Sequence, residues 1–133
     1  MKIDGACHCG LITFQAEIDP EKVRVCHCTD CQTLTGSAFR VVVPVSADKF
    51  SLSGEPTVYV KTAESGARRA QAFCPRCGSP IYAAPADVTP AMYFIRVGTI
   101  RQRSELTPKV QIWARSAQQW VEHLAPMPRI EKQ

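Results

Sequence analysis

The sequence predicts a mainly β fold of antiparallel strands with one or two short helical turns. Its strand-like segments are short, and turn-forming Gly, Pro and Ser residues separate them. These segments never alternate with long helical patterns, which the crossover connections of parallel sheets require. With 133 residues, of which 45% are hydrophobic and 21% charged, the chain has the size and composition of one globular domain. We expect a single domain over residues 1–133, with its core between about residues 5 and 120.

Four segments have the pattern of β-strands. Residues 11–18 alternate apolar and polar side chains, as a half-buried strand does. Residues 37–45 are largely apolar and rich in β-branched side chains, and residues 56–62 form a shorter segment of the same kind. Residues 91–100 form a longer one, in which Gly98 indicates a bend or a bulge.

Only two segments look helical. Residues 30–36 are long enough for one or two turns that end at Gly36, since glycine favours the left-handed conformation that follows a helix. Residues 116–124 predict a short helix with Ser116 as its N-terminal cap. Turns or loops are expected where Gly, Pro and Ser gather, at residues 51–54, 64–69 and 83–91.

The charge and the apolar content argue against several classes of partner. The formal net charge of +4 is small and the basic residues are dispersed, so we expect no nucleic acid partner. No apolar run approaches the ~20 residues of a membrane-spanning helix, so we expect no membrane partner. The first ten residues lack the apolar stretch of a signal peptide, and the expected location is cytoplasmic.

Seven cysteines fall into three groups along the chain. The groups are CHCG at residues 7–10, CHCTDC at residues 26–31 and CPRCG at residues 74–78. An odd number of cysteines in a chain without an export signal argues against a disulfide framework. Cysteines at these spacings are instead typical of metal ligands.

The first and third groups supply enough thiolates for one closed zinc site. Glycine follows each pair and permits the positive φ of a tight turn whose backbone N–H groups point at the sulfurs. The four proposed ligands are Cys7, Cys9, Cys74 and Cys77. Zinc bound there would join the first strand to a late hairpin, and its binding energy would be folding energy. The alternative is a thioredoxin-type redox pair at Cys74 and Cys77, but the strand-to-helix context of that motif is missing.

The middle group, which contains Cys26, Cys28 and Cys31, is one ligand short of a closed site. Catalytic zinc sites keep three protein ligands and leave the fourth position for water or substrate, so we interpret this group as an open, catalytic site. The other possibility is a second structural site that a further residue completes. The candidates for that residue are His8, His27, Asp30 and His123. His8 and His27 each stand between two cysteines, where the middle side chain usually points away from the metal.

Three stretches carry a family resemblance: GACHCGLITF from Gly5, CHCTDCQTLTGSAF from Cys26 and FCPRCGSPIY from Phe73. With a late IW…W segment that ends at Trp120, they resemble the glutathione-dependent formaldehyde-activating enzyme family, which includes the centromere protein V domain. The resemblance implies a zinc-containing β-tent fold, two zinc ions per chain and an activity like that of S-(hydroxymethyl)glutathione synthase, a carbon–sulfur lyase. It implies a structural zinc on Cys7, Cys9, Cys74 and Cys77 and a second, catalytic zinc on Cys26, Cys28 and Cys31.

The resemblance and the open cluster together predict an enzyme that acts on a small-molecule thiol and an aldehyde. Such an enzyme would add a zinc-bound thiol, glutathione or a similar one, to a small aldehyde such as formaldehyde, and would also catalyse the reverse reaction. The alternative is a non-catalytic, zinc-stabilised binding or chaperone module.

Glutathione carries two carboxylates, so its binding site needs cations. The arginines available for this role are Arg40, Arg68, Arg69, Arg96, Arg101 and Arg115. Each of them, taken alone, is expected to be a solvated surface side chain. Trp113 and Trp120 are expected to pack in the core or in the wall of a cleft. The other aromatic residues expected in the core are Phe39, Phe73, Tyr82 and Phe94.

Overall fold

The computed structural model describes residues 1–133 and confirms a mainly β fold. Its strands are β1 Lys2–Ala6, β2 Thr13–Glu17, β3 Arg24–Cys26, β4 Arg40–Ser46, β5 Phe50–Ser53, β6 Thr57–Thr62, β7 Arg68–Phe73, β8 Pro80–Pro85, β9 Met92–Arg96 and β10 Val110–Ile112. The one α-helix is α1 Thr29–Thr35, and the 3-10 helices are η1 Pro20–Lys22, η2 Ala47–Lys49, η3 Val97–Thr99, η4 Arg103–Glu105, η5 Ala114–Ser116 and η6 Gln119–His123. None of these helices has the length and hydropathy of a membrane-spanning segment.

The strands form two sheets. One has three strands in the order β1-β2-β5, and the other has seven in the order β10-β3-β4-β9-β8-β7-β6. All neighbours are antiparallel except β10 and β3, which run parallel with Ile112 beside Cys26. This pair departs from the fully antiparallel prediction. A parallel pair needs a long connection, and here most of the chain lies between the two strands.

The hydrophobic core lies between the two sheets. Phe14 of β2 enters it from the three-stranded sheet, and Val43 of β4, Ile81 of β8 and Ile95 of β9 enter it from the seven-stranded sheet. Each fully buried side chain of this size contributes roughly 1.5–3 kcal/mol to stability. The core therefore occupies one face of the seven-stranded sheet and leaves the other face for a binding site.

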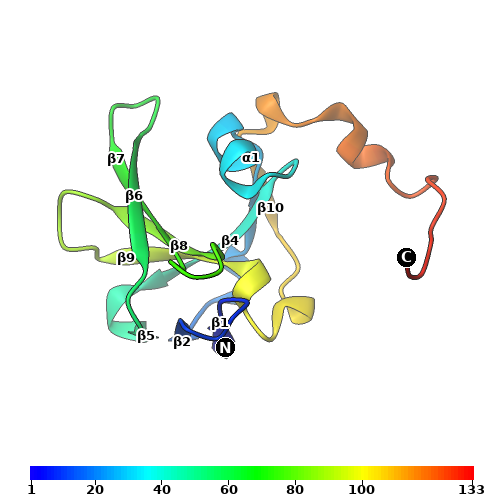
Figure 1. Ribbon diagram of the computed structural model, residues 1–133. Helices are drawn as coiled ribbons and strands as arrows, with labels where there is room; N and C mark the ends of the chain where they lie inside the picture. Colours follow the sequence, from blue (N-terminus) through cyan, green and yellow to red (C-terminus); the bar gives the residue numbers. More distant parts are fainter.

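The opposite face of the seven-stranded sheet lies between two raised walls. In Figure 1 the β6–β7 hairpin rises on one side, and α1 with β10 rises on the other. The same view shows the chain after η5 extending away from both sheets toward the C-terminus. This open face carries the cavities described below.

Three of the four predicted strands are confirmed, and the fourth is shorter than predicted. The confirmed strands are β2 for residues 11–18, β4 for residues 37–45 and β6 for residues 56–62. The segment 91–100 forms β9 only as far as Arg96, and η3, which contains Gly98, follows it. Val97 and Ile100 are both buried, because the three-residue turn of a 3-10 helix points both side chains into the core.

One of the two predicted helices is confirmed, because α1 covers most of the predicted residues 30–36. After α1, Gly36 has the predicted left-handed conformation, with a φ of 64°. The second prediction is wrong in helix type and in cap, because residues 119–123 form the 3-10 helix η6 and Gln118 precedes it. Ser116 instead ends η5, where its carbonyl oxygen accepts a hydrogen bond from Gln32.

All three segments predicted as turns contain turn or bend residues, but each also overlaps a strand. Residues 51–53 belong to β5, Arg68 and Arg69 begin β7, and residues 83–85 end β8. In each case hydrogen bonding to a neighbouring strand outweighs the local turn preference of Ser, Gly or Pro.

Gly5 stands where β1 passes closest to the rest of the chain. A Cβ atom there would overlap the Phe14 ring and the backbone carbonyl oxygen of Thr99. We expect Gly5→Ala to lower the free energy of unfolding by about 1–3 kcal/mol, measured by urea denaturation. Gly98→Ala is the control, because a Cβ atom at Gly98 meets nothing within 4 Å. Equal losses of unfolding free energy in Gly5→Ala and Gly98→Ala would show that overlap at Gly5 is not the cause.

Candidate metal centres and cavity

The first and third cysteine groups meet at one point. The sulfur atoms that converge there are those of Cys7, Cys9, Cys74 and Cys77, all within 4.8 Å of one another. The Sγ of Cys9 lies 3.6 Å from that of Cys7 and 3.7 Å from that of Cys74. Four sulfurs bound to one zinc ion at about 2.3 Å stand roughly 3.8 Å apart at the corners of a tetrahedron. The positions of the sulfurs therefore fit a tetrahedral zinc site.

Two tight turns place these four sulfurs. One turn joins β1 to β2, and the other joins β7 to β8. The glycines that end the two motifs, Gly10 and Gly78, have the positive φ predicted for them, 79° and 74°. The Ile12 N–H donates a hydrogen bond of 3.2 Å to the Cys7 Sγ, as expected of a metal-binding turn. The cluster therefore joins the three-stranded sheet to the seven-stranded sheet.

Ser79, which the sequence pattern did not indicate, links the two turns. Its Oγ accepts a hydrogen bond of 3.0 Å from the His8 N–H and lies 3.2 Å from the Cys77 Sγ. Hydrogen bonds from Ser79 lower the pKa of the Cys77 thiol to about 5. A thiol that ionises below neutral pH is a ready metal ligand.

The middle cysteine group forms a second cluster at the junction of β3 and α1. Cys26 ends β3, Cys28 caps the N-terminus of α1, and Cys31 lies in the first turn of the helix. Their Sγ atoms lie within 4.8 Å of one another. The Cys31 N–H donates a hydrogen bond of 3.2 Å to the Cys28 Sγ. The short helix therefore turns three sulfurs toward one point.

The thiols of this second cluster do not ionise independently. A hydrogen bond from the Cys31 thiol lowers the pKa of Cys26 to about 5. The same interaction, together with burial, raises the pKa of Cys31 far above its ordinary value. Several thiolates at this separation need a cation between them. A divalent ion that prefers thiolates, such as zinc, fits this set of donors.

No further side chain completes the second cluster. The residues considered as a fourth ligand are His8, His27, Asp30 and His123, and none of them has a ligand atom in the cluster. His27 is buried, with its Nε2 2.7 Å from the Gln111 Oε1. The Asp30 carboxylate accepts a hydrogen bond of 2.7 Å from the Lys61 ammonium. The cluster therefore consists of three sulfur atoms.

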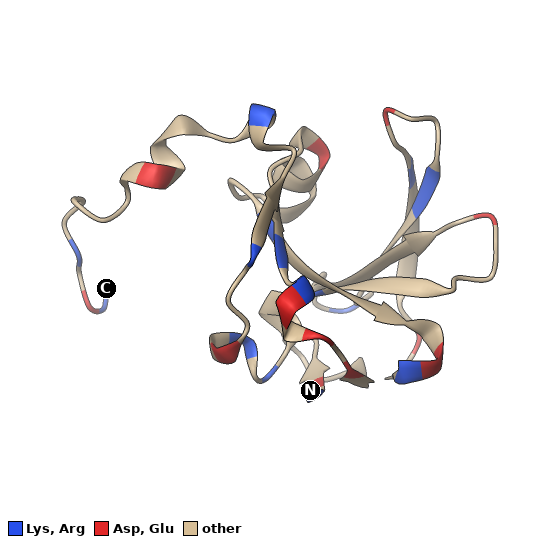
Figure 2. Cartoon of the chain, turned by 180° about the vertical axis from the view of Figure 1, so that it is seen from behind, with Lys and Arg blue, Asp and Glu red and all other residues tan.

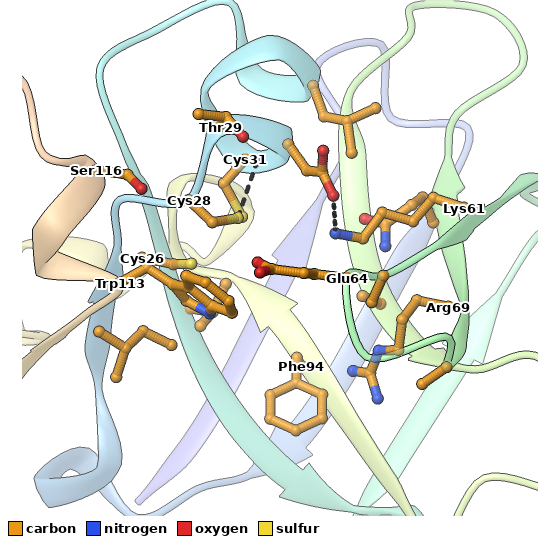
Figure 3. A pocket seen from close by; sticks show the side chains of 18 of the residues that line it. Cys26, Cys28, Thr29, Cys31, Lys61, Glu64, Arg69, Phe94, Trp113 and Ser116 are labelled. Carbon is orange, nitrogen blue, oxygen red and sulfur yellow. Dashed lines mark hydrogen bonds and ion pairs between the residues drawn. The ribbon is translucent and has the colours of Figure 1, made fainter.

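The second cluster opens onto a cavity of about 640 Å³. This first cavity lies between α1 and η5 on one side and the β6–β7 hairpin on the other. In Figure 3 the three cysteines stand together at its edge, with Trp113 on the same side and Phe94 at the opposite end of the view. A cavity of this volume is typical of sites for small-molecule ligands.

Cations outnumber anions in the lining of the first cavity. The basic residues are Arg24, Lys61, Arg69, Arg96 and Arg115, and the acidic residues are Asp30 and Glu64. Lys61 pairs with Asp30 at 2.7 Å and Arg115 pairs with Glu64 at 3.5 Å, which leaves the other three cations without an acidic partner. Figure 2 shows basic segments at η5 and on the β6–β7 hairpin, and in Figure 3 the Glu64 carboxylate extends into the cavity. The lining therefore suits a ligand with more negative than positive groups.

Trp113 lines the first cavity next to a segment that a glutamine of α1 binds. It is the one residue other than glycine with a positive φ, 55°. The Gln32 side chain of α1 donates hydrogen bonds of 2.7 Å to the His27 carbonyl and 2.9 Å to the Ser116 carbonyl. The Arg115 guanidinium lies 5.1 Å from the centre of the Trp113 ring. The wall of a cleft was one of the two environments predicted for Trp113.

Comparison with protein families matches residues 2–116 to the family described as glutathione-dependent formaldehyde-activating enzyme. The match includes all three cysteine groups. The chain belongs to this family. The crystal structure of a Rhodobacter sphaeroides protein, a structural genomics target, has a similar fold, with a TM-score of 0.62 and 17% identity over 81% of this chain and 98% of that chain. A search of curated proteins gave no match.

The arginines considered for glutathione occupy three different environments in this family member. Those that line the first cavity are Arg69, Arg96 and Arg115. Arg68 and Arg101 form ion pairs with aspartates on the surface, as expected of solvated side chains. Arg40 and Arg96 are buried, so the expectation of a solvated side chain is wrong for both. Their strands place them on the face that carries the cavities.

Two aromatic residues expected in the core lie in cavities instead. Phe94 lines the first cavity, and the Arg69 guanidinium lies 5.0 Å from the centre of its ring. Phe73 lines a second, smaller cavity. Tyr82 packs against the core as predicted, whereas Trp120 exposes 48% of its surface, contrary to prediction.

Proposed function

We propose that this family member is a zinc-dependent enzyme of the carbon–sulfur lyase type, which adds a thiol to a small aldehyde and reverses that addition. The proposed thiol is glutathione or a similar molecule, and the proposed aldehyde is formaldehyde. The proposal rests on the three-cysteine cluster, which opens onto a cavity and has no fourth protein ligand. A purely structural zinc site has four protein ligands.

Two zinc ions per chain belong to this proposal. The proposed structural ligands are Cys7, Cys9, Cys74 and Cys77. The proposed ligands of the second, catalytic zinc are Cys26, Cys28 and Cys31. Zinc at the second site would favour the ionised form of a thiol and keep its sulfur nucleophilic. The three cysteines contribute by holding the ion at the edge of the cavity, where a thiol can reach it.

The charges of the first cavity suit glutathione, which has two carboxylates and one ammonium group. Arg24 and Arg69 have no acidic partner and can donate hydrogen bonds to the two carboxylates. Glu64 extends into the cavity and can accept a hydrogen bond from the ammonium group. These contacts would hold the thiol with its sulfur toward the cysteine cluster.

The proposed addition forms one C–S bond. The thiol loses its proton, and its sulfur attacks the carbon of the aldehyde. The π electrons of the C=O bond move to the oxygen, which takes up a proton and leaves a hemithioacetal. One proton is released and one is consumed, so the reaction needs neither an oxidant nor a reductant. The reverse reaction breaks the same C–S bond.

A zinc-stabilised binding or chaperone module is the second candidate function. It is favoured by the C-terminal segment, which extends away from both sheets in Figure 1. The large apolar side chains exposed on this segment are Trp120, Leu124, Met127 and Ile130. In such a module both cysteine clusters would only stabilise the fold, so loss of either cluster would unfold the domain.

Cys28→Ser separates the two candidate functions. We expect the wild type to hold two zinc ions per chain and the variant to hold one, with an unchanged circular dichroism spectrum. Catalysis should fall roughly 100-fold or more, since a bound metal contributes several kcal/mol to the stabilisation of charge in the transition state. The measurement is the rate at which labelled formaldehyde exchanges with its glutathione adduct, followed by NMR and corrected for the uncatalysed rate.

Cys74→Ser is the matched control, because it removes one sulfur from the other cluster. It should unfold the domain, since binding of a structural zinc ion contributes on the order of 10 kcal/mol to folding. If Cys28→Ser unfolds to the same extent, the binding module is favoured. A wild-type protein that holds one zinc ion and does not accelerate the exchange would contradict the proposed enzyme.

Arg69→Gln tests the cationic lining of the first cavity. It should raise the KM for glutathione about tenfold with little change in kcat, which corresponds to the loss of one charged hydrogen bond. Arg68→Gln is the control, because Arg68 is adjacent in the sequence but lies outside the lining. With 2-mercaptoethanol, which has no carboxylate, both variants should match the wild type. Equal effects of Arg69→Gln on the two thiols would argue against binding of a carboxylate by Arg69.

A further inference from the structure

Two arginines lie buried on the cavity-bearing face of the seven-stranded sheet without an acidic partner. Arg40 begins β4 and exposes 4% of its surface, and Arg96 ends β9 and exposes 8%. Val42 pairs with Arg96 across the two strands, and Arg40 is on the same face of β4 as Val42. Neither arginine forms an ion pair with Asp or Glu. Burial of a charge without a partner costs several kcal/mol, so this pair calls for an explanation.

Three donor nitrogen atoms of the pair have no hydrogen-bond acceptor in the protein. They are the Nε and Nη2 of Arg40 and the Nε of Arg96. The Arg96 Nη2, in contrast, has an acceptor, because it donates a hydrogen bond of 2.7 Å to the Gln71 Oε1. Burial and the nearby charge of Arg40 lower the pKa of Arg96 to about 9. Buried donors are nearly always satisfied, so these three indicate an acceptor from outside the chain.

The three-cysteine cluster supplies only part of the countercharge for this pair. Its thiols interact electrostatically with both arginines. Three thiolates around one divalent zinc ion carry a net charge of about −1, whereas two guanidinium groups carry about +2. The guanidinium of Arg69, whose charge also acts on Arg96, adds to this excess of positive charge, and a bound anion would offset it.

Both arginines line a second cavity, of about 350 Å³. It adjoins the first cavity, because Gln71 and Arg96 line both, whereas Arg40 lines only the second. The remaining large side chains around the second cavity are those of Leu34, Tyr59, Phe73 and Pro80. The second cavity therefore combines mostly apolar sides with two guanidinium groups.

We propose that the second cavity binds a small carboxylate with an apolar, ring-sized substituent. The carboxylate would accept hydrogen bonds from Arg40 and Arg96, which guanidinium groups form in a planar, paired geometry. Tyr59 and Phe73 would flank the substituent. The mostly apolar sides of the cavity favour a carboxylate with such a substituent over an inorganic anion such as phosphate. This site adjoins the proposed thiol site, with which it shares Arg96 and Gln71, but it does not depend on the proposed reaction.

Benzoate is the probe for this site, and benzamide, which has the same shape without the charge, is the matched ligand. Isothermal titration calorimetry of the zinc-loaded, full-length protein should show one saturable benzoate site and binding of benzamide at least about tenfold weaker. Arg40→Met should weaken benzoate binding at least about tenfold. Arg69→Met, which alters the lining of the first cavity only, should weaken benzoate binding far less than Arg40→Met does.

Arg40→Met should also retain or raise the unfolding temperature of the ligand-free protein, because it removes an unpaired buried charge. Arg96→Met should give the same loss of benzoate binding as Arg40→Met. The comparison of benzoate with benzamide uses the wild type alone, so it does not depend on the folding of any variant. Absence of saturable benzoate binding, or equal binding of the two ligands, would overturn the proposal. Loss of benzoate binding in Arg69→Met together with displacement of benzoate by glutathione would also overturn it, since the carboxylate would then lie in the first cavity.

Discussion

The position of one sheet on the other depends on four sulfur atoms that meet between them. The turn that holds Cys7 and Cys9 follows the first strand of one sheet, and the turn that holds Cys74 and Cys77 follows β7 of the other. No strand of one sheet pairs with a strand of the other. Apolar packing, this cluster and the polar contacts of β1 with residues 100–102 connect the two sheets. The strand β7 also carries Arg69 of the first cavity. The shape of the binding face therefore depends on the cluster, although the cluster lies outside both cavities.

The helix α1 links the second cluster to both cavities. Its first turn holds Cys28 and Cys31, and Leu34 near its end lines the two cavities. Gln32, between them, holds the helix against the chain that follows Trp113. A shift of this one short helix would move the sulfurs and reshape both cavities together. The proposed thiol site and the proposed carboxylate site therefore share a wall, while each has cations of its own.

Features that depend on neighbouring residues could be predicted from the sequence. The grouping of the cysteines and the end of α1 at Gly36 follow from short spacings and from glycines at the required positions. The three-residue strands β3 and β10 could not be predicted, because each is stabilised by a partner far away in the sequence. The burial of Arg40 and Arg96 could not be predicted either. Arginine is ordinarily exposed, and only the register of β4 against β9 places both side chains in the second cavity, which residues of α1 and β7 also line.

In the proposed enzyme the protein closes one zinc site with four sulfurs and leaves the other open to a thiol. X-ray absorption spectroscopy of the zinc-loaded protein can test this difference, because the spectrum distinguishes sulfur ligands from oxygen or nitrogen. The spectrum averages over both zinc ions, so without a thiol we predict about 3.5 sulfur ligands and about 0.5 lighter ligands per zinc, the mean of a four-sulfur site and a three-sulfur site. Added glutathione should replace the lighter atom with a fourth sulfur. Four sulfurs at both zinc ions before any thiol is added, or no change after its addition, would contradict the claim.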